Sequence, residues 1–125
     1  MMRKTTLYWI IALVVLVAGI AITFKVSAAP GKYDSFTECL STNGATFYGA
    51  FWCSHCSDQK ELFGKSAKYL PYVECSTSDR RSKLPVCEDA GIEGYPTWKF
   101  ADGTEQSGLM TLKQLAAKTD CELPT

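Results

Sequence analysis

The chain has 125 residues, with equal numbers of acidic and basic side chains and a formal net charge of zero. This balance provides no electrostatic basis for binding nucleic acid or a strongly acidic partner, so we expect neither. Beyond an apolar N-terminal segment, the remaining length suffices for one domain with a modest core and is too short for two.

The apolar segment occupies residues 7–24 and contains no charged side chain. As a helix it would be roughly 27 Å long, close to the hydrocarbon thickness of a bilayer. Arg3 and Lys4 precede it, so the positive-inside rule leaves residues 1–6 in the cytoplasm and exports the rest. We therefore predict a single-pass membrane anchor over 7–24 with an extracytoplasmic domain.

A cleaved signal peptide is the alternative for this segment, because Val26-Ser27-Ala28 fits a small-residue cleavage site. The apolar run exceeds the roughly 7–15 residues of a usual signal core, which favours a retained anchor. Both interpretations export the remainder of the chain. We expect a linker over 25–33 and a folded domain over 34–125.

The first elements of the domain are a predicted helix and a predicted buried strand. Ser35 and Glu38 form a capping box that predicts a helix over 34–43, which Gly44 would end. The continuous apolar run over 45–52 is typical of a strand buried on both faces, as in a mixed sheet covered by helices.

A helix, a strand and a short helix are predicted next. The first helix covers 57–68, with a bend at Gly64 because glycine weakens a helix interior by about 1 kcal/mol relative to alanine. The strand is expected within 69–75 and the short helix over 84–90.

A hairpin and a final helix complete the predicted domain. Strands over 96–101 and 104–109 flank Asp102-Gly103, a dipeptide typical of tight hairpins. Thr111 and Gln114 form a second capping box, which opens a helix to about residue 119. The order of elements predicts an α/β fold in which helices flank a mixed central sheet.

Six cysteines are many for an exported domain of this size, and their even number suggests disulfides. Their spacing is uneven, because Cys53 and Cys56 are three residues apart whereas the others are scattered at positions 39, 75, 87 and 121. The two patterns indicate two different roles.

Cys53-Ser54-His55-Cys56 lies where the predicted buried strand ends and a helix begins. There unpaired backbone N–H groups and the helix dipole stabilise a thiolate, which is the species that attacks disulfides. His55 can add positive charge. Stabilising the reduced form makes the corresponding disulfide a stronger oxidant. We predict that Cys53 and Cys56 are a redox-active pair and that His55 assists them.

Other uses of this motif fit the sequence less well. A zinc site would need two more ligands, and the chain has no second CxxC and a single histidine. Haem attachment needs a histidine directly after the second cysteine, where Ser57 stands. A purely structural disulfide at this spacing is uncommon. We expect neither a metal nor a cofactor.

The run Ala50–Cys56, together with Gly94-Tyr95-Pro96-Thr97 downstream, resembles the thioredoxin-fold oxidoreductases. The resemblance implies that Cys53 is the exposed nucleophile, that Cys56 is the resolving thiol and that Tyr95-Pro96 is a cis peptide facing both. Trp52 and Tyr95 neighbour the two motifs, so we expect them to contact a substrate peptide together with Pro96.

Four segments carry a closer resemblance: residues 47–53, 58–63, 70–75 and 94–98. They are similar to the thioredoxin-like domain attached to, or partnered with, bacterial homologues of vitamin K epoxide reductase. In that family the domain oxidises substrate proteins and is reoxidised by a membrane-embedded quinone reductase. The resemblance implies exported substrates with thiols and a separate quinone reductase, since one predicted span cannot house the quinone site.

Two residues depart from the patterns of these families. Ser54 stands where proline is commoner, which leaves the redox potential open. Phe47 lies six residues before Cys53, where thioredoxins and DsbA-like oxidants carry a buried acid. Without a carboxylate to take the proton from Cys56, oxidation is favoured over fast reduction.

The resembling family shares a cysteine pair that corresponds to Cys75 and Cys87, which implies a disulfide restraining residues 76–82. Cys39 and Cys121 would then remain to pair, and so long a loop could contribute roughly 4 kcal/mol in the chain-entropy model. Buried free thiols are the alternative, because sequence does not fix connectivity. A relay of electrons from Cys75 and Cys87 to the CxxC motif is a further alternative.

Together these features predict an extracytoplasmic thiol–disulfide oxidoreductase that passes disulfides to exported proteins. Two other functions stay open from the sequence. One is a disulfide reductase or isomerase, which the redox potential would distinguish. The other is a non-catalytic interaction module stapled by disulfides or zinc.

Overall fold

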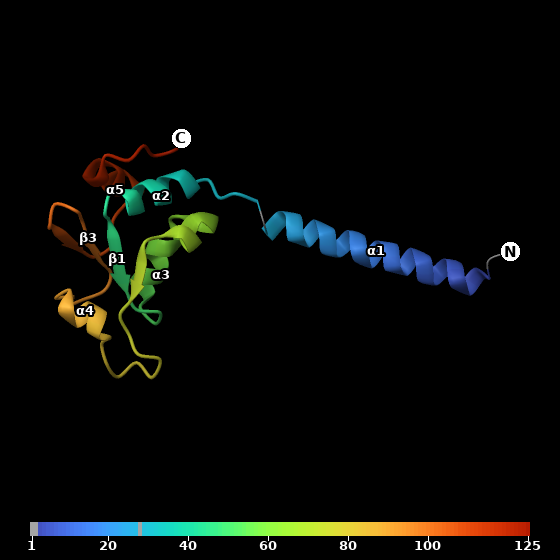
Figure 1. Ribbon diagram of the computed structural model, residues 1–125, viewed down its shortest axis with the longest axis horizontal. Coiled ribbons are helices and arrows are strands. Elements are labelled where there is room, and N and C mark those ends of the chain that lie inside the picture. The colour runs from blue at the N-terminus through green and yellow to red at the C-terminus, as the bar shows by residue number, and fades with distance from the viewer. Residues whose placement is uncertain (1–2, 28) are drawn as a thin grey trace. The chain divides into compact units, whose positions relative to one another are not determined.

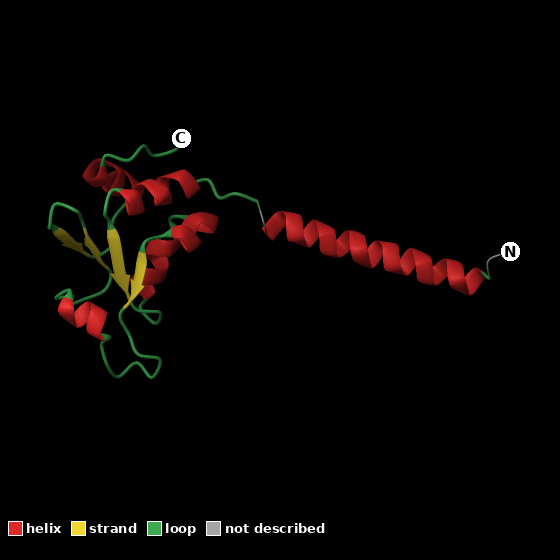
Figure 2. Ribbon diagram, in the orientation of Figure 1, coloured by secondary structure: helices red, strands yellow, loops and turns green. Residues whose placement is uncertain are grey.

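The computed structural model describes residues 3–27 and 29–125, and the chain forms two compact units that meet between Pro30 and Gly31. Figures 1 and 2 display the elements of each unit. Ala28, the last residue of the predicted cleavage site, and the first two residues of the predicted cytoplasmic N-terminus lie outside the described residues.

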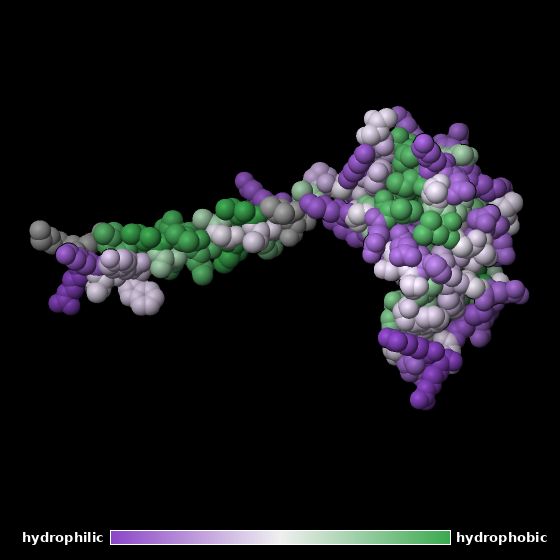
Figure 3. Space-filling view, turned by 180° about the vertical axis from the view of Figure 1, so that it is seen from behind, coloured by the Kyte–Doolittle hydropathy of each residue, from purple (hydrophilic) through white to green (hydrophobic). Residues whose placement is uncertain are grey.

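The first unit contains one long helix, α1 (Lys4–Ser27), which includes the apolar run predicted over 7–24. Its stretch Lys4–Lys25 is long and apolar enough to cross a membrane. Figure 3 shows the apolar side chains along this helix. A secretory signal near the N-terminus would have the same character, so α1 agrees with both interpretations made from the sequence.

The second unit is built around a four-stranded sheet with the order β2-β1-β3-β4. Its strands are β1 (Thr46–Gly49), β2 (Tyr72–Glu74), β3 (Thr97–Lys99) and β4 (Glu105–Ser107). Strand β1 pairs in parallel with β2 and antiparallel with β3, and β3 pairs antiparallel with β4. The sheet is therefore mixed, which confirms the predicted α/β fold class.

Helices pack on both faces of this sheet. They are α2 (Asp34–Thr42), α3 (Ser54–Glu61), the 3₁₀ helix η1 (Gly64–Tyr69), α4 (Pro85–Asp89) and α5 (Leu112–Thr119). Successive residues of a strand point to opposite faces. Accordingly, Phe47 of β1 belongs to the main core, whereas Tyr48 packs against a smaller second cluster.

The main core joins residues of α2, α3 and α5 to the sheet, among them Phe36, Leu40, Phe47, Cys56, Trp98 and Leu115. The second cluster consists of Cys75, Cys87 and Ile92, in and beside α4. The ring of Phe47 stacks on that of Trp98, with centroids 5.0 Å apart. Trp98 and Phe100 are both buried in this core.

The capping box predicted at Ser35 and Glu38 is wrong. Helix α2 starts at Asp34 after Tyr33, and no side chain caps it. The backbone N–H of Tyr33 donates to Ser66 Oγ at 2.9 Å, and Asp34 Oδ2 accepts from the N–H of Gly31 at 2.9 Å. The chain before α2 is thus fixed by a tertiary contact, and the N-cap lies at Tyr33, two residues before Ser35, although the helix starts at Asp34 as predicted.

The predicted boundaries around the CxxC motif also need correction. Strand β1 ends at Gly49, because the chain then turns and the N–H of Cys53 donates to Ala50 O. The helix predicted over 57–68 instead starts at Ser54 and ends at Glu61. Gly64, the first residue of η1, has a φ of +53°, outside the right-handed helical region, so the expected bend is a break between α3 and η1.

The C-terminal predictions hold more closely. Asp102-Gly103 lies in the turn between β3 and β4, and Gly103 has a φ of +80°. The capping box at α5 is confirmed, because Thr111 Oγ1 accepts from the N–H of Gln114 while the Gln114 side chain accepts from the N–H of Thr111. Both features depend on residues close in sequence, and tertiary contacts do not override them.

Candidate active site

The CxxC motif lies at the junction of a strand and a helix. Cys53 is the N-cap residue of α3, with extended backbone angles, and Ser54 is the first helical residue. Cys53 is partly buried, whereas Cys56 is 1% exposed, and both are free thiols. The motif thus presents one sulfur near the surface and hides the second inside the main core.

Burial of Cys56 governs its acidity. Desolvation, joined by the neighbouring Cys53, raises the pKa of the Cys56 thiol to about 12. A backbone hydrogen bond with Ala50 and the positive charge of Lys60 act in the opposite direction. At neutral pH, Cys56 is therefore a neutral thiol, and it becomes a nucleophile only when its charge is stabilised.

Gly49, the last residue of β1, leaves room for this buried sulfur. A Cβ atom at position 49 would lie 2.9 Å from Cys56 Sγ and 2.9 Å from Cε2 of Tyr72. Real Cβ atoms do not approach other atoms so closely. The absence of a side chain here lets the sulfur and the Tyr72 ring edge come together.

The loop before β3 faces Cys53. The Tyr95-Pro96 peptide is cis, and Cys53 Sγ donates a weak hydrogen bond to the carbonyl of Tyr95 at 3.7 Å. The ring of Trp52 meets that of Tyr95 edge-on at 6.1 Å. Trp52 is 46% exposed, whereas the side chain of Pro96 is buried. The structure thus brings these three residues together beside Cys53, with Trp52 the most accessible.

His55 points to solvent. Its side chain is 73% exposed, and Nδ1 lies 3.6 Å from Asp58 Oδ2 on the same helix. Protonation of His55 would therefore form an ion pair within α3. The spacing of three residues between His55 and Asp58 was a signal for this pair that the sequence reasoning did not use.

An aromatic stack surrounds Phe47, the residue six positions before Cys53. Phe47 is fully buried between Trp98 and Tyr72, whose ring centroid is 5.1 Å from that of Phe47. No carboxylate replaces it on β1. The nearest acid on the adjacent strand is Glu74 of β2, which pairs with Gly49 in register.

Glu74 was not predicted as part of the site, although it interrupts an apolar strand. Its carboxylate accepts hydrogen bonds from the hydroxyl of Tyr72 at 2.7 Å and from the backbone N–H groups of Ser76 at 2.9 Å and Phe51 at 3.3 Å. The last of these bonds links β2 to the turn before Cys53. Burial is the main cause that raises the pKa of Tyr72, and the hydrogen bond with Glu74 is the second. The hydroxyl of Tyr72 therefore stays protonated.

Gln59 is a second residue that the sequence reasoning missed. It is fully buried, and its amide donates to Met110 O at 3.0 Å and accepts from Met110 N at 2.8 Å and Trp98 Nε1 at 3.2 Å. These bonds fasten α3 to β3 and to the segment before α5. A polar residue three positions after Cys56, on the same helical face, was the available signal.

The four remaining cysteines form two disulfides. Cys39 in α2 is bonded to Cys121, just after α5, and Cys75 is bonded to Cys87. Both Cys75 and Cys87 are fully buried. The first bond closes a loop across the whole domain, and the second restrains the segment between β2 and α4.

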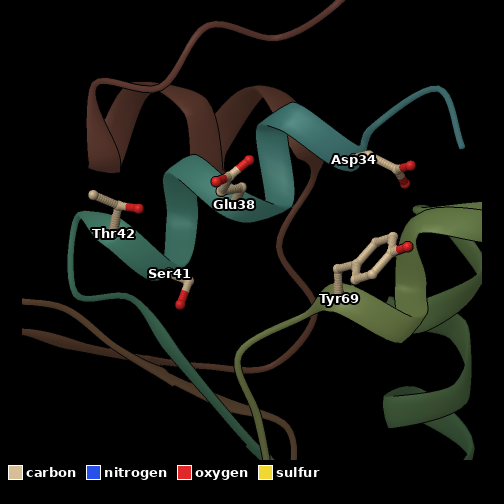
Figure 4. Close-up of a pocket in the computed structure, with 5 residues that line it drawn as sticks. All are labelled: Asp34, Glu38, Ser41, Thr42 and Tyr69. Atoms are coloured by element: carbon tan, nitrogen blue, oxygen red, sulfur yellow. The ribbon is translucent and has the colours of Figure 1, made fainter. Parts of the chain in front are cut away.

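A separate surface pocket lies between α2 and η1. Figure 4 shows the residues that line it, which are Asp34, Glu38, Ser41, Thr42 and Tyr69. Neither cysteine of the CxxC motif contributes to it, so it is distinct from the candidate active site.

No protein-family model matches the chain. Among curated proteins, it is 48% identical over 104 residues to the thiol-disulfide oxidoreductase LTO1 of Arabidopsis thaliana, covering 79% of this chain and 27% of that protein. It is 27% identical over 94 residues to a protein disulfide-isomerase of Humicola insolens, covering 72% of this chain and 19% of the isomerase. It is 30% identical over 86 residues to the protein disulfide-isomerase-like protein EhSep2 of Emiliania huxleyi, covering 60% of this chain and 37% of that protein.

These relatives and the fold support a thioredoxin-like oxidoreductase. All three relatives are named for disulfide chemistry, which agrees with the free dithiol at the start of α3. The chain spans about a quarter of the length of the Arabidopsis relative and less than two fifths of the other two.

Proposed function

We propose that this protein is an extracytoplasmic thiol–disulfide oxidoreductase that passes disulfides to exported proteins through Cys53 and Cys56. In this proposal, residues 7–24 anchor the chain in the membrane and residues 34–125 are the catalytic domain outside. A separate membrane quinone reductase of the vitamin K epoxide reductase type reoxidises the dithiol after each turnover.

The unequal exposure of the two cysteines is the observation that carries this proposal. The partly exposed Cys53 is the N-cap residue of α3, and Cys56 is 1% exposed. An incoming thiolate can therefore reach the Cys53 sulfur of the oxidised pair and not the Cys56 sulfur. Attack at Cys53 leaves the substrate attached at the surface, where a second substrate thiol can displace it.

The proposed reaction proceeds in two exchanges. A substrate thiolate attacks Cys53 Sγ of the Cys53–Cys56 disulfide, the bond between the two cysteines breaks, and its electron pair leaves on Cys56. A second substrate thiolate then attacks the substrate sulfur in the mixed disulfide and releases Cys53 as a thiolate. The substrate loses two electrons and two protons, and the enzyme gains them as a dithiol.

The aromatic residue at position 47 supports the oxidative direction. In reduction of a substrate, Cys56 must lose its proton to attack the mixed disulfide. Phe47 offers no carboxylate for that proton, and burial raises the pKa of Cys56 to about 12. The missing proton acceptor slows reduction of a substrate, whereas the raised pKa of Cys56 slows both directions, because this thiolate is also the leaving group when a disulfide is donated.

A disulfide reductase or isomerase is the second candidate function, favoured by the relatives that are named protein disulfide-isomerases. The redox potential of the Cys53/Cys56 couple separates the two. A potential near that of DsbA, about −120 mV, would support a disulfide donor, whereas a value near that of thioredoxin, about −270 mV, would support a reductase.

Trapping of mixed disulfides in cells tests the proposed function directly. A full-length Cys56→Ala variant should retain substrates on Cys53, and mass spectrometry should identify exported proteins together with a quinone-linked membrane protein. The Cys53→Ala variant is the matched control and should trap neither. If Cys53→Ala also left the oxidation of a reduced substrate unchanged, the protein would be a non-catalytic module.

The membrane anchor needs a separate test. Intact mass of the protein purified from membranes distinguishes a retained α1 from cleavage after residue 28. Labelling of Cys53 in unbroken cells with a membrane-impermeant maleimide then reports the side of the domain. Labelling only after lysis would contradict the extracytoplasmic location.

A further inference from the structure

Lys60 lies one helical turn after Cys56 on α3, and residues four apart share one face of a helix. Its side chain is not extended into solvent. The ammonium nitrogen lies 3.5 Å from the centroid of the Tyr72 ring, which is close cation–π contact. Lys60 is thus held against β2 on the same side of α3 as the buried thiol.

The Tyr72 ring joins Lys60 to Cys56. Its face carries the ammonium group, while its edge and Cys56 Sγ both lie 2.9 Å from the position that a Cβ of residue 49 would take. The hydroxyl donates to Glu74 at 2.7 Å, and Phe47 packs edge-on against the ring. The ring is therefore fixed on several sides, and it holds the ammonium group near the sulfur.

Several titratable groups surround Cys56. They are Cys53 at the start of α3, Lys60 further along it, Tyr72 and Glu74 on β2, and Tyr95 in the loop before β3. Burial and Cys53 raise the pKa of Cys56, and the charge of Lys60 lowers it. Among these surrounding groups, Lys60 is the cation.

We propose that Lys60, held on the face of Tyr72, is a positioning residue that stabilises the Cys56 thiolate during disulfide exchange. The inference rests on the proposed function and extends it to a residue outside the CxxC motif. When a substrate thiolate attacks Cys53, the Cys53–Cys56 bond breaks and its electron pair leaves on Cys56 beside the ammonium group. Cys56 then takes a proton from water. In the reverse direction, Cys56 gives its proton to water and attacks Cys53.

The contact of Lys60 with Tyr72 also fits the absence of an acid at position 47. A buried thiolate next to aromatic rings is costly, and a nearby cation offsets part of this cost. A cation acts on the thiolate itself, whereas a carboxylate would act as a proton acceptor. A cation therefore lowers the barrier in both directions of exchange, whereas a carboxylate would assist the direction in which Cys56 loses its proton.

The resolution step of a mixed disulfide isolates the effect of Lys60. Full-length reduced protein in detergent is treated with 5,5′-dithiobis(2-nitrobenzoate), which first forms a mixed disulfide on Cys53. Attack by Cys56 then releases a second thionitrobenzoate at a rate that is independent of reagent concentration. The rate constant of this second phase is measured from pH 6 to pH 10.

Three variants give the comparison. Lys60→Met keeps the length of the side chain without its charge and should slow the second phase by about tenfold at neutral pH, with its pH profile displaced upward. Lys60→Arg restores the charge and should recover most of the rate. Lys113→Met, at an exposed position of α5, should match the wild type. Thermal unfolding of each variant checks that it is folded.

Equal pH profiles for Lys60→Met and Lys113→Met would overturn the inference. A slow second phase in both Lys60→Met and Lys60→Arg would also overturn it, because packing and not charge would then be the cause. Failure of the proposed function gives a different result, since the Cys56→Ala variant would then trap no exported protein in cells, whereas the reaction of the purified protein with 5,5′-dithiobis(2-nitrobenzoate) would be unchanged.

Discussion

Gly49 and Cys56 lie so close together that a methyl group at position 49 would stand 2.9 Å from the Cys56 sulfur. The contact joins the end of the central strand to the helix that carries both active-site cysteines. It explains why this strand position has no side chain, since any Cβ would displace either the sulfur or the Tyr72 ring.

Gly49→Ala is expected to destabilise the domain by about 1–3 kcal/mol, the usual cost of overpacking a core. The displaced Cys56 should also resolve mixed disulfides more slowly. Chemical denaturation measures the first effect. Gly94→Ala is the control, because nothing lies within 4 Å of its added Cβ. Equal stabilities of the two variants would contradict the close contact.

The two active-site cysteines should differ sharply in their reaction with iodoacetamide. In the folded, reduced protein at pH 8, Cys53 should be carboxamidomethylated and Cys56 should not, because Cys56 is 1% exposed and its pKa is raised to about 12. Peptide mass spectrometry locates the label. In the Cys53→Ala variant, Cys56 should stay unmodified until denaturant is added, and rapid labelling without denaturant would contradict its burial.

The reduced protein should lose stability at alkaline pH because of Cys56. Burial raises the pKa of this thiol from its ordinary value of 9.0 to about 12, so the folded state binds more protons than the unfolded state between these values. The stabilisation is fully present below pH 9 and is lost as the pH rises towards 12. It amounts to a few kcal/mol, since a tenfold change in an ionisation constant corresponds to about 1.4 kcal/mol.

Denaturant unfolding of reduced wild-type protein and the Cys56→Ser variant at pH 8 and pH 11 checks this expectation. The difference in unfolding free energy between the two proteins should fall at the higher pH. All other ionisable groups are the same in both proteins, so their contribution largely cancels in the difference. A difference that is independent of pH would rule out the raised pKa.

Gln59→Leu should destabilise the domain by about 1–3 kcal/mol, because it leaves the backbone groups of Met110 and the indole N–H of Trp98 without their buried partner. Gln59→Glu keeps the acceptor oxygen but loses the donor to Met110 O, so it should also lower the stability of the domain at neutral pH. Thermal unfolding of the reduced protein measures both. The neighbouring exposed residue Asp58 supplies a control in Asp58→Asn.

Local sequence patterns predicted those features that neighbouring residues decide. The capping box of Thr111 and Gln114, the hairpin turn at Asp102-Gly103 and the apolar helix near the N-terminus follow from short-range hydrogen bonding or composition. The location of Cys53 at a strand-to-helix junction was also predicted, although the helix starts at Ser54 and not after the motif.

The environment of the buried thiol depended on the tertiary structure. Gly49, Lys60 and Tyr72 lie on elements that meet only in the folded domain, and no sequence spacing indicates that they share the space beside Cys56. The capping box expected at Ser35 failed for the same reason, because Ser66 holds the chain before α2. Sequence alone determined which cysteines could form a reactive pair, since thiol chemistry depends on residue type and local backbone. Packing across the sheet decided which of the two is exposed and which charge the other meets, since burial and electrostatics depend on distances between residues remote in the chain.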